Sequence, residues 1–166
     1  MKKIALLWAV FAVSTGLAQD QPSLVGTWKL DIAQSNFGSE PALESATLIV
    51  LKDSPQMFSW RVRAVDDKGK PHSVTWSGPE DGSMHPVMAG GKPTGSQQSA
   101  KREQDGTRVR HGVDADGSAF ESHDSLSPDG NTLTSEITSK SKDGQENTVK
   151  MVSHRVVGSV SAKAAS

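Results

Sequence analysis

Five Asp-Gly dipeptides constrain the fold of this chain more than any other feature of its sequence. They are Asp81-Gly82, Asp105-Gly106, Asp116-Gly117, Asp129-Gly130 and Asp143-Gly144, and from Asp105 onwards they recur every 11 to 14 residues. Asp and Gly both tolerate the positive φ that tight turns require, so each dipeptide predicts a hairpin turn. Short alternating stretches separate the dipeptides, and the sequence therefore predicts a meander of antiparallel strands.

The stretches between the turns have the composition and the two-residue alternation of strands. The predicted strands are 24–31, 43–51, 58–65, 72–77, 84–88, 97–104, 108–113, 120–126, 133–137 and 149–156. The Gly- and Pro-rich stretch 79–95 is predicted to loop around the short strand 84–88, and the one helical candidate is a turn around 31–36. We predict an all-β, antiparallel up-and-down meander closed into a barrel of about 8–10 strands, with an open two-sheet sandwich as the alternative.

The first residues have the pattern of a secretory signal. Lys2 and Lys3 precede an apolar run at 4–13, and Gly16-Leu17-Ala18 fits a small-x-small cleavage site. The apolar run has half the length of about 20 residues that a membrane-spanning helix needs. Residues 1–18 are therefore predicted to be a signal peptide. The chain has no cysteine, so we expect neither disulfides nor a lipid-modified cysteine, and a soluble periplasmic or extracellular product without a membrane anchor.

Charge and length suggest a single acidic domain after cleavage. Removal of residues 1–18 leaves 148 residues (166 − 18) with 16 basic (18 − 2) and 19 acidic side chains, a net charge of −3. This charge argues against nucleic acid as a partner. We predict a linker at 19–23, one β-barrel domain at 24–157 and a disordered tail at 158–166.

Three sequence elements carry a resemblance to a known group of proteins. They are Gly26-Thr27-Trp28-Lys29-Leu30-Asp31 followed by Ala33-Gln34-Ser35-Asn36-Phe37; Asp81-Gly82 followed by Pro86-Val87; and Leu126-Ser127-Pro128-Asp129-Gly130-Asn131-Thr132-Leu133-Thr134. In this order they resemble the small exported bacterial lipocalin-like (calycin-type) β-barrel proteins, over about residues 24–157. The resemblance implies a barrel in which Trp28 lies at the closed end and Arg155, from the last strand, packs across its ring.

The aromatic face of one predicted hairpin is the candidate ligand-binding site. Phe58 and Trp60 alternate with polar residues on one strand, and Val74 and Trp76 do so on the next. If this face lines the open mouth of the barrel, it suits a small, modestly apolar ligand. The alternative for all four residues is packing in the core.

Arginines and histidines on the same strands have two interpretations each. Arg61 and Arg63 alternate with the aromatic residues and belong either to a solvated outer face or to an inward basic pair for a carboxylate or phosphate. His72 and His111 are in phase with apolar neighbours, so both are predicted to face the interior. We predict no metal and no cofactor, because no His-Glu-x-x-His spacing occurs and the Asp-Gly turns lack the dense acidic loop of a calcium site.

Three functional hypotheses follow from these residues. The first is a binding protein for a small molecule. The second is an interaction or structural module of the cell envelope without a ligand cavity, which applies if the polar residues Ser122, Asp124 and Ser135 face inward. The third, an enzyme that uses His72 or His111 as an acid or base, lacks a second identifiable catalytic group, and we predict that the protein is not an enzyme. Ser122-His123-Asp124 is no triad, because neighbours on a strand point to opposite faces.

Overall fold

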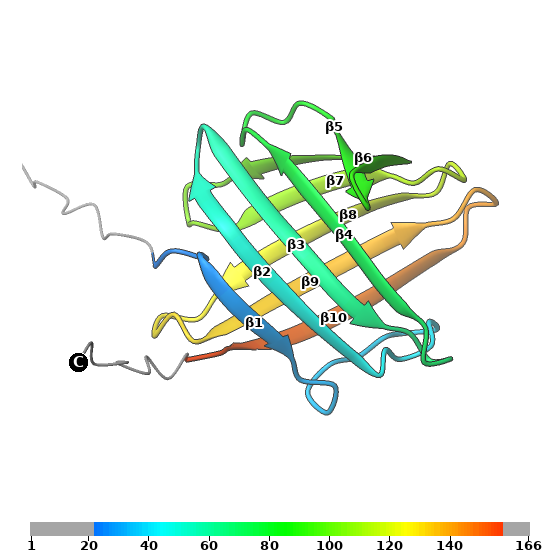
Figure 1. Cartoon of the computed structure of the whole chain (residues 1–166), viewed down its shortest axis with the longest axis horizontal. Helices are drawn as coiled ribbons and strands as arrows, with labels where there is room; N and C mark the ends of the chain where they lie inside the picture. The colour runs from blue at the N-terminus through cyan, green and yellow to red at the C-terminus, as the bar shows by residue number, and fades with distance from the viewer. Residues whose placement is uncertain (1–21, 158–166) are drawn as a thin grey trace, which may run out of the picture.

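The computed structural model describes residues 22–157, which form one antiparallel β-barrel (Figure 1). Each strand is followed along the chain by its neighbour in the sheet. The ten strands are β1 (Gly26–Leu30), β2 (Ser45–Ser54), β3 (Met57–Val65), β4 (Pro71–Gly78), β5 (His85–Ala89), β6 (Lys92–Arg102), β7 (Arg108–Val113), β8 (Ala119–Leu126), β9 (Thr132–Lys140) and β10 (Glu146–Arg155).

The barrel closes because the first strand pairs with the last. β1 lies between β2 and β10, with Trp28 opposite Arg155 in the β1–β10 register. This confirms the predicted all-β, up-and-down closed barrel. The predicted helical turn at 31–36 is a turn in which the Ser35 N–H donates to the Ile32 carbonyl at 3.3 Å. Between residues 22 and 157, no helix is long and apolar enough to cross a membrane.

The prediction of a loop over most of 79–95 was too long. β5 and β6 fill the second half of this stretch, and Gly90 and Gly91 alone turn the chain between them, with φ of +56° and +78°. β5 is weakly joined to β4, by the single register pair Thr75–Met88, and its pairing with β6 shifts between Pro86 and Met88. Proline has no backbone N–H and cannot donate a hydrogen bond to a neighbouring strand, so the pairing is interrupted next to Pro86.

Four of the five Asp-Gly dipeptides lie in hairpin turns, but of a different type from the one predicted, whereas Asp81-Gly82 lies in the longer connection between β4 and β5, where Asp81 forms a bridge with Lys101. In the turn at 114–118 the Asp114 N–H donates to the Ser118 carbonyl at 2.8 Å and the Gly117 N–H donates back to the Asp114 carbonyl at 2.9 Å. Within residues 22–157 only glycines have positive φ, Gly117 among them at +89°. The aspartate therefore keeps negative φ, and the loop is a three-residue turn with glycine at the bulge position. The Asp116 carboxylate accepts the Ser118 N–H at 2.9 Å.

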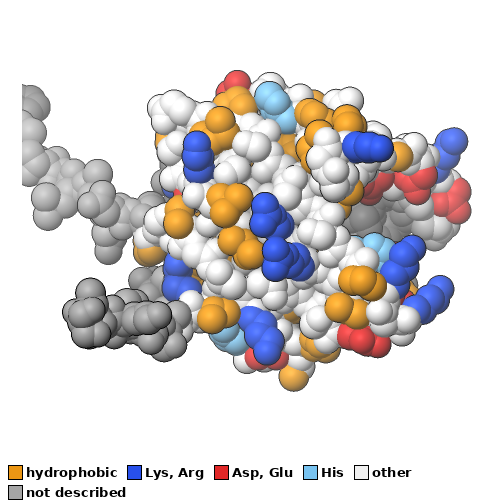
Figure 2. Space-filling view, viewed as in Figure 1, with side chains coloured by type: hydrophobic (Ala, Val, Ile, Leu, Met, Phe, Trp, Pro, Cys, Tyr) orange, Lys and Arg blue, Asp and Glu red, His pale blue; other side chains and the backbone are white. Residues whose placement is uncertain are grey.

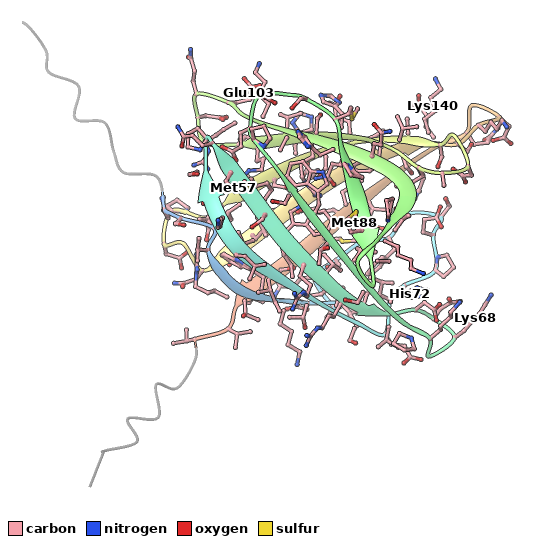
Figure 3. The ribbon with its side chains drawn as sticks, turned by 45° about the horizontal axis from the view of Figure 1, so that its top comes forward. Met57, Lys68, His72, Met88, Glu103 and Lys140 are labelled. Atoms are coloured by element: carbon pink, nitrogen blue, oxygen red, sulfur yellow. The ribbon has the colours of Figure 1, made fainter. Side chains whose placement is uncertain are left out.

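The two ends of the barrel are closed to different degrees. Figure 3 shows Met57 and Glu103 at one end, and Lys68, His72 and Lys140 at the other. At the first end Trp28 is fully buried and the Arg155 guanidinium lies 4.2 Å from the centroid of its ring. The cation–π pair implied by the resemblance is therefore present.

A network of four charged side chains closes the same end above the hydrophobic core. Arg102 and Arg108 each pair with both Asp53 and Glu80, and the side chains of Arg108, Asp53 and Glu80 are at most 2 % exposed. The Arg108 guanidinium also lies 3.7 Å from the centroid of the Phe58 ring. Two positive and two negative charges balance, so this end of the barrel is sealed by a neutral cluster.

The inner and outer faces of β7 are the reverse of what the apolar pattern predicted. Arg108 and Arg110 point inward, while His111 and Val113 are exposed on the outside. His111 instead pairs with Glu121 of β8 across the outer surface, with Nδ1 3.4 Å from the carboxylate. The prediction that His111 faces the interior was wrong, because inward acidic groups, Asp124 on the neighbouring strand and Asp53 and Glu80 at the sealed end, hold the arginines inside.

Candidate ligand-binding cavity

A cavity of about 230 Å³ lies inside the barrel. Its wall is mainly aliphatic and aromatic and comes from strands on both sides of the barrel. The lining residues are Leu24, Leu30, Leu43, Ala46, Leu48, Val50, Phe58, Trp60, Val62, Arg110, Asp124, Leu133, Ser135, Ile137, Met151 and Ser153. The predicted polar residues Asp124 and Ser135 therefore face inward, and a cavity exists beside them.

The exposure of the lining side chains shows where the cavity opens. Val50 and Phe58, toward the sealed end, are buried, whereas Leu43, Ala46 and Met151, toward the opposite end, are partly exposed although they line the cavity. The sealed end carries the Trp28–Arg155 pair and the four-charge network. The cavity is thus a pocket with a closed floor and a mouth among the loops at the other end.

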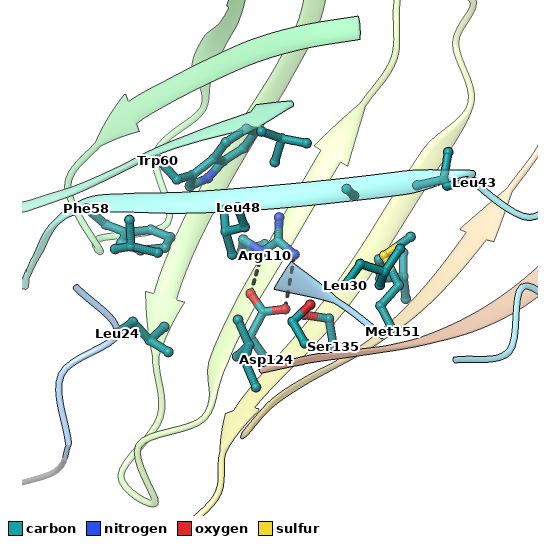
Figure 4. A pocket seen from close by; sticks show the side chains of 16 residues that line it. Leu24, Leu30, Leu43, Leu48, Phe58, Trp60, Arg110, Asp124, Ser135 and Met151 are labelled. Atoms are coloured by element: carbon teal, nitrogen blue, oxygen red, sulfur yellow. Dashed lines mark hydrogen bonds and ion pairs between the residues drawn. The ribbon is translucent and has the colours of Figure 1, made fainter. Parts of the chain in front are cut away.

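One ion pair lies in the mainly apolar wall (Figure 4). Arg110 of β7 donates from Nε to Asp124 Oδ2 at 2.6 Å and from Nη2 to Oδ1 at 3.0 Å. Nη2 also donates to Ser122 Oγ at 2.9 Å, and that hydroxyl donates to Asp124 at 2.9 Å. In the register of β7 and β8, Arg110 lies opposite Ser122, and Asp124, two residues further along β8, is its diagonal neighbour on the same face. Arg110 and Asp124 therefore form a bidentate salt bridge, and its hydrogen bonds restrict the movement of both side chains.

Asp124 is held in its ionised form. Burial on its own raises the pKa of this carboxyl, but the charge of Arg110 and hydrogen bonds from Arg110, Ser135 and Ser122 outweigh it, so the pKa is lowered below its ordinary value. An arginine side chain keeps its positive charge in proteins. The wall therefore carries one positive and one negative charge, which cancel.

Arg110 keeps one hydrogen-bond donor in the wall that has no protein acceptor among residues 22–157. The third guanidinium nitrogen of Arg110, Nη1, points away from Asp124 (Figure 4), and none of the hydrogen bonds of this side chain uses it. The Arg110 side chain is 17 % exposed even though it faces inside the barrel. The indole Nε1 of Trp60 also has no partner among the described residues, but this atom is fully buried and out of reach of a ligand in the cavity. Arg110 Nη1 is therefore the donor of the wall that is free to bind an acceptor of a ligand.

The structure divides the four predicted ligand-binding residues into two pairs. Phe58 and Trp60 line the cavity, whereas Val74 and Trp76 do not. Trp76 belongs to the core: its ring centroid lies 6.0 Å from that of Phe58, and its Nε1 donates to the Gln98 carbonyl at 3.0 Å. Val74 packs against the same core cluster.

The predicted arginine and histidine candidates lie away from the cavity. Arg61 and Arg63 are on the outer face of β3, where Figure 2 shows basic and apolar side chains scattered without one continuous apolar area. His72 lies at the mouth with a half-exposed side chain, and its Nε2 is 2.9 Å from Asp66. The prediction that His72 faces the interior is also wrong, because the strand ends at the rim, where Asp66 and solvent surround the ring. His72 and His111 each have a carboxylate in reach, yet neither lines the cavity.

Arg110 is the candidate site residue that sequence reasoning missed. The pattern of its strand assigns it to the outer face, because Val109 and Val113 look like the inner face. The signal that could have revealed it is on the next strand: Ser122 and Asp124 share a face with the apolar Phe120 and Leu126. An inward carboxylate needs a cation, and the nearest strand offers arginines at alternate positions.

The predicted signal peptide at 1–18, most of the linker at 19–23 and the tail at 158–166 lie outside the described residues. Within 22–157, no group of three or more His, Cys, Asp or Glu side chains is arranged to hold a metal ion.

Comparisons with known proteins do not assign a family. No protein-family model matches the sequence, and no curated protein matches it. Among solved structures, a chain from the de novo design of a fluorescence-activating β-barrel is similar at 12% sequence identity and a TM-score of 0.49, over 81% of this chain and 94% of that chain. The function of this chain therefore has to be argued from its own residues.

Proposed function

We propose that the protein binds a small, largely apolar molecule inside its barrel, without chemical conversion. The observation that carries this proposal is the interior cavity, whose wall is apolar apart from one ion pair and a few hydroxyls. Concave apolar sites with few, fixed polar groups are typical of small-molecule binding. An internal cavity lowers the stability of a protein, so a barrel with a purely structural role would be more stable if side chains filled its interior.

The volume of the cavity limits the size of the ligand. A dry cavity of about 150 Å³ binds benzene in another protein. Scaling to about 230 Å³ gives a ligand of about nine non-hydrogen atoms. Long-chain lipids and large pigments exceed this size, whereas a monocyclic aromatic compound with a short side chain matches it.

Isothermal titration calorimetry with propylbenzene tests the proposal. This probe has the predicted size and no polar group, so burial of its surface should give saturable binding to one site per chain with a negative heat-capacity change. No binding at the solubility limit of propylbenzene contradicts the proposed function.

A matched pair of variants locates the binding site. Ala46 lines the cavity from β2, and its neighbour Thr47 does not line it. Ala46→Phe should fill the cavity and abolish binding of propylbenzene, whereas Thr47→Phe, on the opposite face of the same strand, should leave it unchanged. Equal effects of the two substitutions place binding outside the barrel.

We also propose that the protein acts outside the cytoplasm, on the strength of the basic and apolar segments of residues 1–18. N-terminal sequencing of the mature protein from cell fractions tests this: a periplasmic or extracellular product starting at Gln19 is expected, and an intact Met1 terminus in the cytoplasm contradicts it. The alternative of an envelope module without a ligand has less support, because the inward polar residues Ser122, Asp124 and Ser135 leave room for a cavity beside them.

A further inference from the structure

We propose that the cavity selects a neutral ligand with a hydrogen-bond acceptor, such as a ketone, aldehyde or ester, and rejects a carboxylate of the same size. This inference rests on the binding function proposed above and specifies the chemical class of the ligand. It is carried by the Arg110–Asp124 pair in the cavity wall and by the one donor, Arg110 Nη1, that this pair leaves free.

The charge of the wall is already balanced before any ligand enters. Within residues 22–157, Arg110 and Asp124 are the only charged residues of the lining, and they pair through two hydrogen bonds of 2.6 and 3.0 Å. The next charged cluster, around Arg108 at the sealed end, is balanced as well. A ligand carboxylate would add an uncompensated negative charge beside the Asp124 carboxylate, away from water. Burial of an unpaired charge is strongly unfavourable.

The free charged hydrogen-bonding group of the wall is a donor, Nη1 of Arg110, which points away from Asp124 into the cavity. The hydroxyls of Ser135 and Ser153 also line the cavity and can either donate or accept. A carbonyl oxygen accepts a hydrogen bond from such a donor and brings no charge. The bond is charge-assisted, because the guanidinium keeps its positive charge while paired with Asp124. A ligand with only hydrogen-bond donors gains nothing from Arg110 Nη1.

The geometry of the pair gives the orientation of the ligand. The fork to Asp124 uses Nε and Nη2, and the second contact of Nη2 goes to Ser122, so the position and plane of the guanidinium are fixed. The acceptor of the ligand therefore meets Nη1 in the wall, and its apolar part contacts Leu48, Phe58 and the aliphatic side chains that surround them.

Calorimetry with three ligands of similar size tests whether the cavity prefers a neutral acceptor to an apolar ligand and to a carboxylate. They are propylbenzene, which has no acceptor, propiophenone, which adds a ketone, and 3-phenylpropanoate, which adds a carboxylate. We expect propiophenone to bind about tenfold more tightly than propylbenzene, which is the effect of one charge-assisted hydrogen bond. We expect 3-phenylpropanoate to bind at least about tenfold more weakly than propylbenzene.

Asp124→Asn tests the role of charge directly. It removes the negative charge and leaves Arg110 uncompensated, so 3-phenylpropanoate should bind at least about tenfold more tightly than to the wild type. Propylbenzene should change by less than about threefold. Arg63→Met, which removes an exposed arginine from the outer face of β3, is the matched control and should change none of the three affinities.

If the Asp124→Asn variant does not fold, a second variant tests the same proposal. The double substitution Arg110→Met with Asp124→Leu replaces the buried pair by apolar side chains of similar volume, a change that folded proteins often tolerate. It should bind propiophenone no more tightly than propylbenzene, because the donor is gone.

The outcomes distinguish this inference from the proposed function. If none of the three ligands binds the wild type, the proposed function is wrong. If propylbenzene binds but 3-phenylpropanoate binds as tightly as propiophenone, the cavity exists and the selection for neutral acceptors is wrong. The same conclusion holds if the double variant still prefers propiophenone over propylbenzene.

Discussion

The contact between Trp28 and Arg155 should contribute a measurable coupling free energy to the stability of the barrel. Trp28 is completely buried, and its Nε1 donates to the Leu24 carbonyl at 2.8 Å. Arg155 covers the ring and donates to the carbonyls of Gly130, Val25 and Ser23 at 2.8, 2.7 and 2.7 Å. One side chain thus joins the first strand, the last strand and the turn between β8 and β9.

The magnitudes follow from these contacts. Trp28→Ala removes a fully buried indole and should lower the free energy of unfolding by about 3–5 kcal/mol. Arg155→Met keeps much of the aliphatic stem but loses the cation–π contact, worth about 0.5–2 kcal/mol, and three hydrogen bonds. Two of those carbonyls are exposed and can bond to water instead, so we expect a total loss of about 2–3 kcal/mol.

Urea unfolding of the wild type, both single variants and the double variant measures the coupling. Circular dichroism is the suitable signal, because Trp28→Ala also removes a fluorophore. We expect the double variant to be more stable than the sum of the single losses predicts, by about 0.5–2 kcal/mol. If Trp28→Ala unfolds the protein, Trp28→Phe replaces it in the same cycle. Losses that add within about 0.3 kcal/mol would refute the argument that this pair seals the barrel as one unit.

Three further substitutions test other contacts of the barrel. Gly112→Ala places a Cβ 2.0 Å from the Phe120 ring and should cost about 1–3 kcal/mol in urea unfolding; a cost that persists in a Phe120→Ala background contradicts the steric explanation. Asp53→Asn leaves Arg108 short of one partner in the buried network and should cost about 3–5 kcal/mol in thermal unfolding, whereas a loss below about 1 kcal/mol argues against this role of the network. The pKa of Asp124 is lower in the folded state than its ordinary value of 3.8, so its stabilising effect is complete above about pH 4 and is lost as the pH falls through the folded pKa. Asp124→Asn should therefore reduce the dependence of unfolding free energy on pH below about pH 4, and an unchanged acid profile would show that another group controls it.

Much of the architecture could be predicted from local sequence alone. Glycine is the residue that adopts positive φ at each Asp-Gly turn, as at Gly117 and Gly144, so the turns mark where the strands end. Alternation between the turns supplied the strands, and the length of the meander favoured closure over open edges. The composition of 79–95 still indicated the short strand 84–88, which is β5, but it hid the start of β6 at Lys92, because strands rich in Gly and Pro have little intrinsic signal.

The inner face of each strand was decided by tertiary structure. Alternation shows that the two faces of a strand differ, but it does not show which face is inside. On β7 the sequence offers valines on one face and arginines on the other, and local hydrophobicity favours the valines as the inner face. In the barrel, Asp124 on the neighbouring strand and Asp53 at the sealed end hold Arg110 and Arg108 inside.

The chemistry of the candidate site depends on that choice of face. The sequence determined that Phe58 and Trp60 belong to the aromatic face of a hairpin, and this face does meet the cavity. Whether the same cavity also contains a charge depended on the pairing of Arg110 with Asp124, 14 positions away along the chain. A charged side chain is stable in an apolar interior only when a partner of opposite charge is buried beside it. The strand order and register of the closed barrel bring Arg110 of β7 next to Asp124 of β8. Neither strand taken alone shows that this pair forms.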